Sequence, residues 1–370
     1  MQQQLPTSIV LEKVEMEVQP IPPKMQIDDL PDYLGKVFHF KFHGQAMEYF
    51  GIWIVNIVLT IATLSLYAPW AKVRRLRYFY NNTEFFDRFF DFTGLPTRIL
   101  MGRLIALSIW GFFAVAGYLE MSVAAFGGVV IYLALPWLLR ATLRFRSRNS
   151  KFGNSRFYFD GKTSEAYKLF FLGLVITFFS WGIFFPVVIW FYKRYVIDHL
   201  YVGQLKFKLN NSWTDYMTAA LMPIMIYIAI IFACSMFLVI GIASQTRMLL
   251  TSSGYLFGAA LLFGIVFIIP LIHARIFITT WNSTTLGYSQ FKTDCDQWRY
   301  AWIVASNWFV KILSVGLMTA WAEIRLYRYQ VESLSIRLLD DPNKMRNIRQ
   351  SDPNAIAEEI SDIFDLDISL

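Results

Sequence analysis

The sequence predicts an all-α, multi-pass membrane protein built from internal helical-hairpin repeats, which short β-strands join on one side of the membrane. The composition supports this, because 56% of the residues are hydrophobic, only 16% are charged and the mean hydropathy is +0.42. Soluble domains usually carry about a quarter charged residues. The chain also contains several apolar runs of membrane length and a basic segment that recurs along it.

Seven apolar runs approach or exceed the roughly 18 residues that a membrane span requires. They are 46–68, 99–119, 121–139, 169–192, 216–242, 255–272 and 300–318. A large soluble core would need these runs broken into amphipathic faces, and they are continuous. The runs therefore predict a membrane protein.

A basic, aromatic segment, named the cassette here, recurs at five places in the chain. It opens with Pro or Ala, followed by Trp in three copies, and ends on a small polar residue or His. The five copies are 69–82, 136–149, 186–199, 270–283 and 320–333. Their shared arginines are Arg77, Arg144, Arg194 and Arg328 at one position, and Arg74, Arg275 and Arg325 at another. Self-similarity of this kind predicts a repeat architecture.

Between cassettes the sequence alternates apolar and polar residues, which predicts short strands. These strands are expected at 38–42, 89–92, 156–159, 205–209 and 290–291. An acidic residue follows three of them at one spacing, as Glu48, Glu165 and Asp215, while Arg98 and Gln297 take that place in the others. An acid in the first helical turn is favourable through the helix dipole alone.

Two topologies fit these elements. Counting each run as one span gives seven spans and puts similar strands on opposite sides of the membrane. Alternatively, the first, third and fifth units are hairpins that turn near 64–67, 180–183 and 314–317 and return through the cassette. The hairpins are favoured because similar segments should face similar environments. The positive-inside rule then places the strands in the cytoplasm.

Hairpins would carry arginines to membrane depth, where an unpaired charge costs at least about 2.5 kcal/mol. We expect Glu48 to lie level with Arg77, and the other two acids to compensate Arg194 and Arg275. The candidates for charged pairs or a polar path are Glu48, Arg74, Arg77, Arg144, Glu165, Arg194, Asp215, Arg275 and Lys311. Alternatively, these charges only hold hairpins together or snorkel to the interface.

The flanking regions differ from this membrane domain, which is expected over 36–335. Residues 1–35 are predicted to form a polar, disordered tail without a cleaved leader, and 336–370 an acidic, solvated tail. A small amphipathic helix is expected near Ile356–Phe364.

Catalysis receives little support from the residues present. Four histidines and two cysteines show no metal-ligand spacing, and no phosphate-binding loop or nucleophile elbow is found. We therefore expect no cofactor and no metal, and favour a non-enzyme.

The first unit resembles a known bacterial family. Residues 42–53, with Glu48-Tyr49, and the cassette region 67–83 are similar to the YjgN family of inner-membrane proteins, and the likeness extends over about 36–335. The third and fourth cassettes depart from the pattern, with Val187 and Leu271 in place of Trp and Ile278 in place of Arg. The resemblance implies a multi-pass protein of the bacterial inner membrane, and it brings no activity or site residues with it.

Two function classes remain open. The first is a transporter or channel-like protein for a small or anionic solute, which predicts charges along a continuous cavity. The second is a structural or lipid-interacting scaffold, in which each buried charge is paired. The net charge of +7 lies mainly in the cassettes, next to apolar runs, and predicts anionic lipid headgroups as partners, not nucleic acid. The sequence leaves open whether the protein forms a homo-oligomer.

Overall fold

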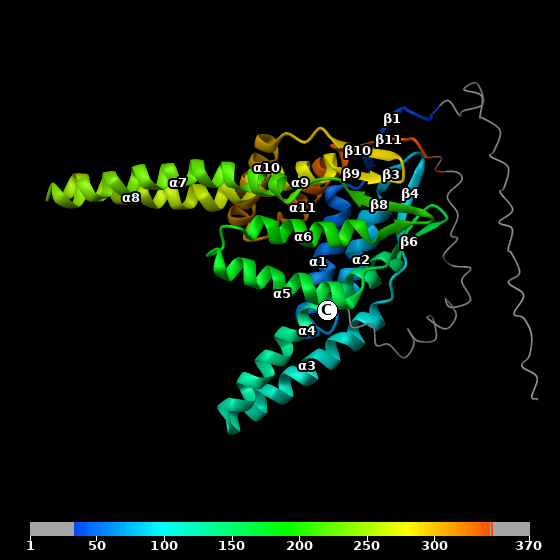
Figure 1. Cartoon of the computed structure of the whole chain (residues 1–370). Helices are drawn as coiled ribbons and strands as arrows, with labels where there is room; N and C mark the ends of the chain where they lie inside the picture. Colours follow the sequence, from blue (N-terminus) through cyan, green and yellow to red (C-terminus); the bar gives the residue numbers. More distant parts are fainter. Residues whose placement is uncertain (1–32, 341, 343–370) are drawn as a thin grey trace, which may run out of the picture.

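A computed structural model describes residues 33–340 and 342 of the chain. The expectation of an all-α protein is wrong, because an eleven-stranded antiparallel sheet forms one end of the molecule (Figure 1). Its strands are β1 (Val37–His39), β2 (Lys41–Phe42), β3 (Thr83–Phe85), β4 (Arg88–Phe92), β5 (Ser150–Phe152), β6 (Ser155–Phe159), β7 (Leu200–Val202), β8 (Leu205–Leu209), β9 (Thr284–Leu286), β10 (Ser289–Thr293) and β11 (Leu334–Arg337). The alternating segments predicted from sequence are each paired with a shorter strand that directly follows a cassette.

The sheet curls into a nearly closed barrel. β1 pairs with β11 and β2 pairs with β3, and only Phe40 separates β1 from β2. The Phe40 N–H donates to the carbonyl of Leu334 at 3.1 Å, so the first strand bridges the two ends of the sheet. Closure removes exposed strand edges, which stabilises such short strands. Since all described strands belong to this one sheet, they lie together and not on opposite faces of a membrane.

Tight two-residue turns join the strands at the end of the barrel that lies farthest from the helices. Three of these turns have a glycine with positive φ, at Gly153, Gly203 and Gly287. The fourth uses Phe86 and Asp87, both with positive φ. Positive φ at the first turn position matches the twist of the flanking strands.

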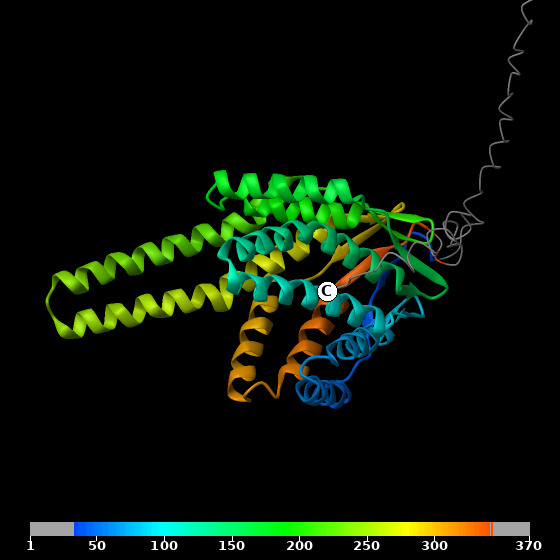
Figure 2. The same ribbon diagram turned by 90° about the horizontal axis from the view of Figure 1, so that it is seen from below.

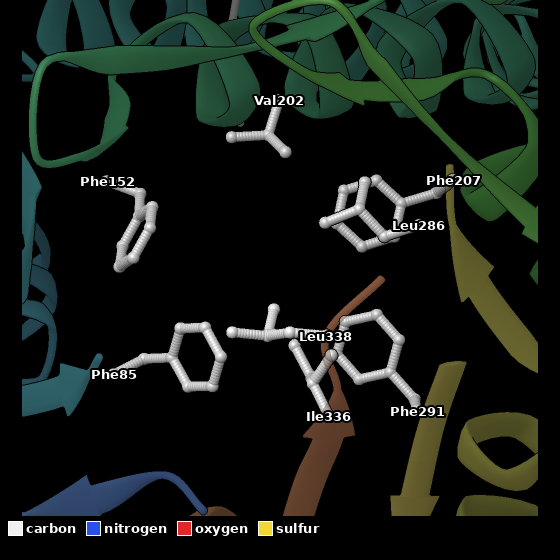
Figure 3. Packing of buried hydrophobic residues seen from close by; sticks show 8 residues of the cluster. All are labelled: Phe85, Phe152, Val202, Phe207, Leu286, Phe291, Ile336 and Leu338. Atoms are coloured by element: carbon white, nitrogen blue, oxygen red, sulfur yellow. The ribbon is translucent and has the colours of Figure 1, made fainter. Parts of the chain in front are cut away.

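The barrel interior is apolar. Alternate residues of a strand point to one face, and the inward set packs together (Figure 3). Its buried members are Phe85, Phe152, Val202, Phe207, Leu286, Phe291, Ile336 and Leu338. Leu338 follows β11 and lies among the strand residues, so the chain after β11 closes over this core.

The segment expected to be an acidic, solvated tail begins as part of the fold. β11 runs to Arg337, and Asp340 accepts hydrogen bonds from the backbone of Tyr288 and Ser289 at 2.7 and 3.0 Å. A Cβ on Gly287 would lie 2.7 Å from Asp340 Oδ2, so this turn needs glycine. The predictions for residues 1–32 and for the amphipathic helix near 356–364 lie outside the described residues.

Helices project from the barrel in pairs. They are α1 (Ala46–Ala62), α2 (Ala68–Asn81), α3 (Pro96–Leu119), α4 (Met121–Arg148), α5 (Thr163–Phe179), α6 (Phe185–Asp198), α7 (Trp213–Ala243), α8 (Arg247–Phe263), the π-helical turn η2 (Gly264–Ile268), α9 (Ile269–Asn282), α10 (Gln297–Leu313) and α11 (Thr319–Glu332). The pairs splay outward, and the α7–α8 arm reaches farthest from the sheet (Figures 1 and 2). Contacts of α2 with α3, α4 with α5, α6 with α7, α9 with α10 and α11 with α1 close a ring.

Within the part of the chain that the structure describes, four helices are long and apolar enough to cross a membrane, by length and composition. They are 96–118 in α3, 121–148 in α4, 213–243 in α7, and the continuous stretch 247–282 from α8 to α9. Of the seven apolar runs in the sequence, the run 169–192 is divided by a turn into two helices, and the runs 46–68 and 300–318 end in turns. The turns themselves are apolar, which is why the runs looked continuous.

Candidate functional site

The acid–arginine pairs expected from sequence have other partners in the structure. Glu48 Oε2 accepts from the Tyr78 hydroxyl at 3.2 Å, whereas Arg77 donates to the carbonyls of Phe92 and Gly94, both at 3.1 Å. Glu48 acts at the start of its own helix, while Arg77 reaches the end of the next unit's strand. Glu48 and Arg77 therefore do not pair with each other. Glu48 bonds a tyrosine near the start of its own helix, and Arg77 bonds carbonyls at the end of β4.

The other two expected pairs, Glu165 with Arg194 and Asp215 with Arg275, do not form either, because each residue has another partner. Glu165 lies 3.1 Å from His199 Nε2, and Arg194 lies 3.3 Å from Asp198 on its own helix. The third acid, Asp215, completes a capping box with Ser212 at the start of α7.

The remaining candidates, Arg275, Arg74, Arg144 and Lys311, lie on different helices and have different partners. Arg275 donates to the carbonyl of Ala219 and the side chain of Gln297, both at 2.9 Å. Arg74 donates to the Tyr67 hydroxyl at 3.1 Å. Arg144 is half-buried in the last two turns of α4, and Lys311 lies in the last turn of α10.

Arginines of the second helices tie neighbouring units together at glycines that follow the strands. Arg77 donates to Gly94, as described above, and Arg140 to the carbonyl of Gly161 at 2.6 Å. Arg328 donates to Gly44 at 2.7 Å, which joins the last unit to the first. A guanidinium satisfies strand-end carbonyls well because it presents several donors in a fixed plane.

Two open grooves contain several of these arginines. One, with a volume of about 570 Å³, lies between α1 and α2 and is lined by Glu48, Arg74 and Arg77 among others. The other, of about 370 Å³, lies between α10 and α11 and is lined by Arg299, Arg325, Arg328, Trp302, Trp321 and Glu332 among others. The first groove brings three of the sequence candidates to one surface.

A different set of cations lies on α2, α3 and α4, with tyrosines of α2, α6 and α11 nearby. Tyr80 of α2, Tyr192 of α6 and Tyr327 of α11 lie near the guanidinium of Arg146 on α4. Tyr327 also lies 3.2 Å from Thr83, and Tyr80 accepts from Ser150 at 3.3 Å. Since Thr83 and Ser150 begin β3 and β5, this group lies at the mouth of the barrel.

Lys72 and Arg103 extend this group of charges. Burial, and then the charges of Arg103 and Arg146, lower the pKa of Lys72. Among the described residues, the carboxylate ion pairs involve other cations and not Lys72, Arg103 or Arg146. We name Lys72, Arg103 and Arg146, with Tyr80, Tyr192 and Tyr327, the axial cluster.

Further polar groups lie on the second helices, where His273 and Glu323 stand at the cassette position of Lys72, and Lys193 stands four residues later in its cassette. Burial lowers the pKa of Lys193 on α6, and His273 on α9 interacts with that lysine. Glu323 on α11 accepts from the Tyr49 hydroxyl at 2.7 Å and lies 3.4 Å from Arg75.

The sequence reasoning missed the axial cluster because it followed positions that the cassettes share. Lys72 corresponds to Leu139 and His273 in other copies, and Arg146 corresponds to Phe79 and Thr280. Cassette positions that hold a charged residue in one copy and an uncharged residue in another would have identified Lys72 and Arg146.

Comparison with known proteins places the chain in a family. Residues 38–363 match the model of a family described as "Bacterial protein of unknown function (DUF898)". The chain belongs to this family. Over 100 residues it is 32% identical to the inner membrane protein YjgN of Escherichia coli K12, covering 27% of this chain and 25% of that protein.

Two further relatives carry the same name. The YjgN protein of Escherichia coli O157:H7 is 28% identical over 124 residues, 33% of this chain and 31% of that protein. The Salmonella typhimurium LT2 protein is 35% identical over 69 residues, 19% and 18% of the two chains. The aligned region thus spans a third or less of these relatives. No solved structure matches the chain.

The family, the named relatives and the four long apolar helices agree on location. This family member is a multi-pass protein of the bacterial inner membrane, as the sequence predicted.

Proposed function

We propose that the protein is a transporter or channel-like protein for a small anionic solute, and that the axial cluster binds this solute. The observation that carries the proposal is that Lys72 of α2, Arg103 of α3 and Arg146 of α4 act on one another electrostatically, and that no described carboxylate forms an ion pair with them. Like charges held together in partly desolvated surroundings are unfavourable until an anion joins them. Three cations and three hydroxyls offer the donors that a phosphate or carboxylate group accepts.

The protonation of Lys72 should depend on whether an anion is bound. Its pKa is lowered by burial and by two guanidinium groups, so a bound anion would stabilise the protonated lysine. The hydroxyls of Tyr80 and Tyr327 are held by Ser150 and Thr83, which fixes them near Arg146. These contacts would orient a small polyatomic anion.

Anion binding to the purified protein in detergent tests the proposal. We expect inorganic phosphate or succinate to raise the melting temperature in a saturable way. Arg146→Gln should weaken this response at least tenfold, while the charge-matched control Lys208→Gln, at an exposed position on β8, should retain it. The proposal is refuted if neither anion gives a saturable response, or if Arg146→Gln responds like the wild type.

Transport itself requires proteoliposomes. We expect phosphate or succinate efflux above that of empty vesicles, and its loss in Arg146→Gln. Efflux that is equal in both variants would contradict a role for the axial cluster in the path.

A second candidate function is a structural or lipid-interacting protein. The apolar filling of the barrel and the arginine–carbonyl ties between units favour it. The two arginine-lined grooves suit anionic lipid headgroups, which we propose as partners. Lipid and metabolite profiling of a deletion strain separates the two functions, since a scaffold should change lipids and a transporter a soluble metabolite pool. That nucleic acid is not a partner stays a prediction, and a homo-oligomer stays a proposal.

We also infer that the five units are copies of one repeat. One position in the first helix of each pair is buried in every unit, at Tyr49, Ile99, Ala166, Tyr216 and Tyr300. Four of the second helices, α2, α6, α9 and α11, have the same length of 14 residues.

The barrel is proposed to face the cytoplasm. Exposed basic residues on its strands, such as Lys41, Lys206 and Lys208, fit the positive-inside rule. Compartment reporters fused after Asn82 and after His199 should both report the cytoplasm, and opposite signals would contradict the proposal.

A further inference from the structure

The three short helix pairs end in turns with large, exposed apolar side chains. Leu64, between α1 and α2, is 90% exposed, Trp181, between α5 and α6, is 94% exposed, and Val315, between α10 and α11, is 92% exposed. Their neighbours Leu66, Ile183 and Leu317 are also exposed. We name these turns, residues 63–67, 180–184 and 314–318, the apolar tips.

Each apolar tip satisfies its own backbone donors. In the third tip, Val315, Gly316 and Leu317 donate to the carbonyls of Ile312, Lys311 and Ser314 at 3.1, 2.8 and 3.0 Å. Met318 N–H then donates to the hydroxyl of Ser314 at 3.0 Å. The helices thus join without leaving these backbone N–H groups to be solvated by water.

The same pattern recurs in the other two tips. Tyr67 N–H donates to the Thr63 hydroxyl at 2.9 Å, and Phe184 N–H donates to the Ser180 hydroxyl at 3.2 Å. The remaining donors from 63 to 68 and from 180 to 185, prolines apart, bond to carbonyls of the preceding turn. Within hydrocarbon, an unsatisfied backbone group costs several kcal/mol, so internal satisfaction is a condition for placing a turn there.

The tips also use residues that a turn in water rarely would. Leu64, Trp181 and Val315 all adopt a left-handed backbone with φ between +49° and +52°. This conformation is unfavourable for residues with a Cβ and most of all for a β-branched residue such as valine. Three of the four barrel turns use glycine at the corresponding kind of position, and the fourth uses Phe86, whose side chain packs against the barrel core. Large apolar side chains at the tips are understandable if they contact lipid.

The turns of the two long pairs have opposite chemistry. α3 and α4 join at Glu120, which is exposed, and α7 and α8 join through 244–247, which includes exposed Gln245 and Arg247. Such residues suit an aqueous surface. α7 has 31 residues and α10 has 17, so α7 is about 20 Å longer, at about 1.5 Å per residue.

We propose that the apolar tips are immersed in lipid acyl chains, so that the three short pairs are re-entrant hairpins in the leaflet next to the barrel. The long pairs alone would then cross the hydrocarbon layer, which is about 30 Å thick. Lys311 lies one turn before the third tip, so the proposal places this charge close to the immersed end of the hairpin. The inference does not depend on anion binding.

Spin labels at single cysteines test this placement. In full-length protein carrying Cys234→Ala and Cys295→Ala, one cysteine is introduced by Leu64→Cys, Trp181→Cys or Val315→Cys and labelled. The controls are Gln245→Cys at a long-pair turn and Tyr288→Cys at an exposed barrel turn. The protein is placed in vesicles of phosphatidylethanolamine and phosphatidylglycerol. Collisions with oxygen, which concentrates in lipid, and with a water-soluble nickel chelate are compared.

We expect labels at the three tips to collide at least several-fold more with oxygen than with the nickel chelate. Labels at 245 and 288 should show the reverse preference. Tip labels that favour the nickel chelate would overturn the proposal, because the tips would then be in water. Tip labels shielded from both reagents would also overturn it, because a second copy of the chain would then cover the tips.

Discussion

The long and short helix pairs begin at the same barrel but end in different surroundings. α3–α4 and α7–α9 are long enough to span a bilayer and turn through polar or charged residues. α1–α2, α5–α6 and α10–α11 are shorter and turn through apolar residues. The contrast teaches that the chemistry of a turn, more than the hydropathy of its helices, separates a span from a re-entrant hairpin.

The two kinds of pair also differ at their bases. In each short pair, a tyrosine of the second helix bonds the residue that caps the first, as Tyr78 with Gln45, Tyr195 with Lys162 and Tyr329 with Asp296. The corresponding positions in the long pairs are Phe145 and Thr279. The two helices of a short pair pack against each other over a shorter length. The hydrogen bond from the tyrosine to the capping residue adds a contact between them at the barrel end.

The largest effect should come from a charge at an apolar tip. Val315→Asp places a carboxylate where lipid is expected, and we predict a loss of about 2 to 3 kcal/mol in the free energy of unfolding, measured in bicelles. Gln245→Asp, at the turn of a long pair, should change stability by less than about 0.5 kcal/mol. If Val315→Asp and Gln245→Asp changed the free energy of unfolding equally, the turns of short and long pairs would have the same surroundings and the proposal would be contradicted.

Removing a tip hydroxyl should have a smaller effect. Ser314→Ala leaves the Met318 N–H without its acceptor, and an unsatisfied buried donor costs about 1 to 3 kcal/mol. The matched control is Ser244→Ala, because the Ser244 hydroxyl accepts from Thr246 N–H in a turn where water can replace it. We predict a clear loss for the first variant and a change within about 0.5 kcal/mol for the second. If Ser244→Ala lost more stability than Ser314→Ala, the turn at 244–247 and not the tip at 314–318 would be the one shielded from water.

The smallest effect concerns the tyrosine at the base. Tyr329→Phe removes two hydrogen bonds to Asp296 and should cost about 1 kcal/mol at neutral pH, whereas Thr279→Val in a long pair should cost less.

The pH dependence of Tyr329 gives this comparison a second readout. Burial first, and then the neighbouring Cys295, raise the pKa of Tyr329 to about 12. Its contribution is complete below the unfolded pKa of about 10 and is lost as pH rises through the folded value. The stability difference between wild type and Tyr329→Phe should therefore shrink from pH 10 to pH 12. A constant difference over this range would exclude the tyrosine as its source.

Much of the architecture could be predicted from the sequence, and the failures have physical causes. Alternation identified the strands that became β4, β6, β8 and β10, and the breaks near 64, 181 and 315 were expected as hairpin turns. The strands that follow the cassettes are mostly three residues long, too short for a period to be visible, so the barrel was missed. The alternative count of seven spans exceeds the four long apolar helices because the tips are as apolar as the helices they join.

The candidate site was predicted less well. The shared arginines were visible, but their partners are backbone carbonyls of the next unit, which only the closed ring brings within reach. Lys72 and Arg146 stand at different cassette positions, and no spacing in the sequence predicts that helices of separate units bring them together.

The most direct test of the difference between the pairs is two-sided labelling in membrane vesicles with a membrane-impermeant maleimide. In the cysteine-free background, Gln245→Cys should react from one side only and Tyr288→Cys from the opposite side only. Val315→Cys should react from neither side until the membrane is dissolved in detergent. Reaction of Val315→Cys with the reagent in intact vesicles, from either side, would contradict the immersion of the short pairs.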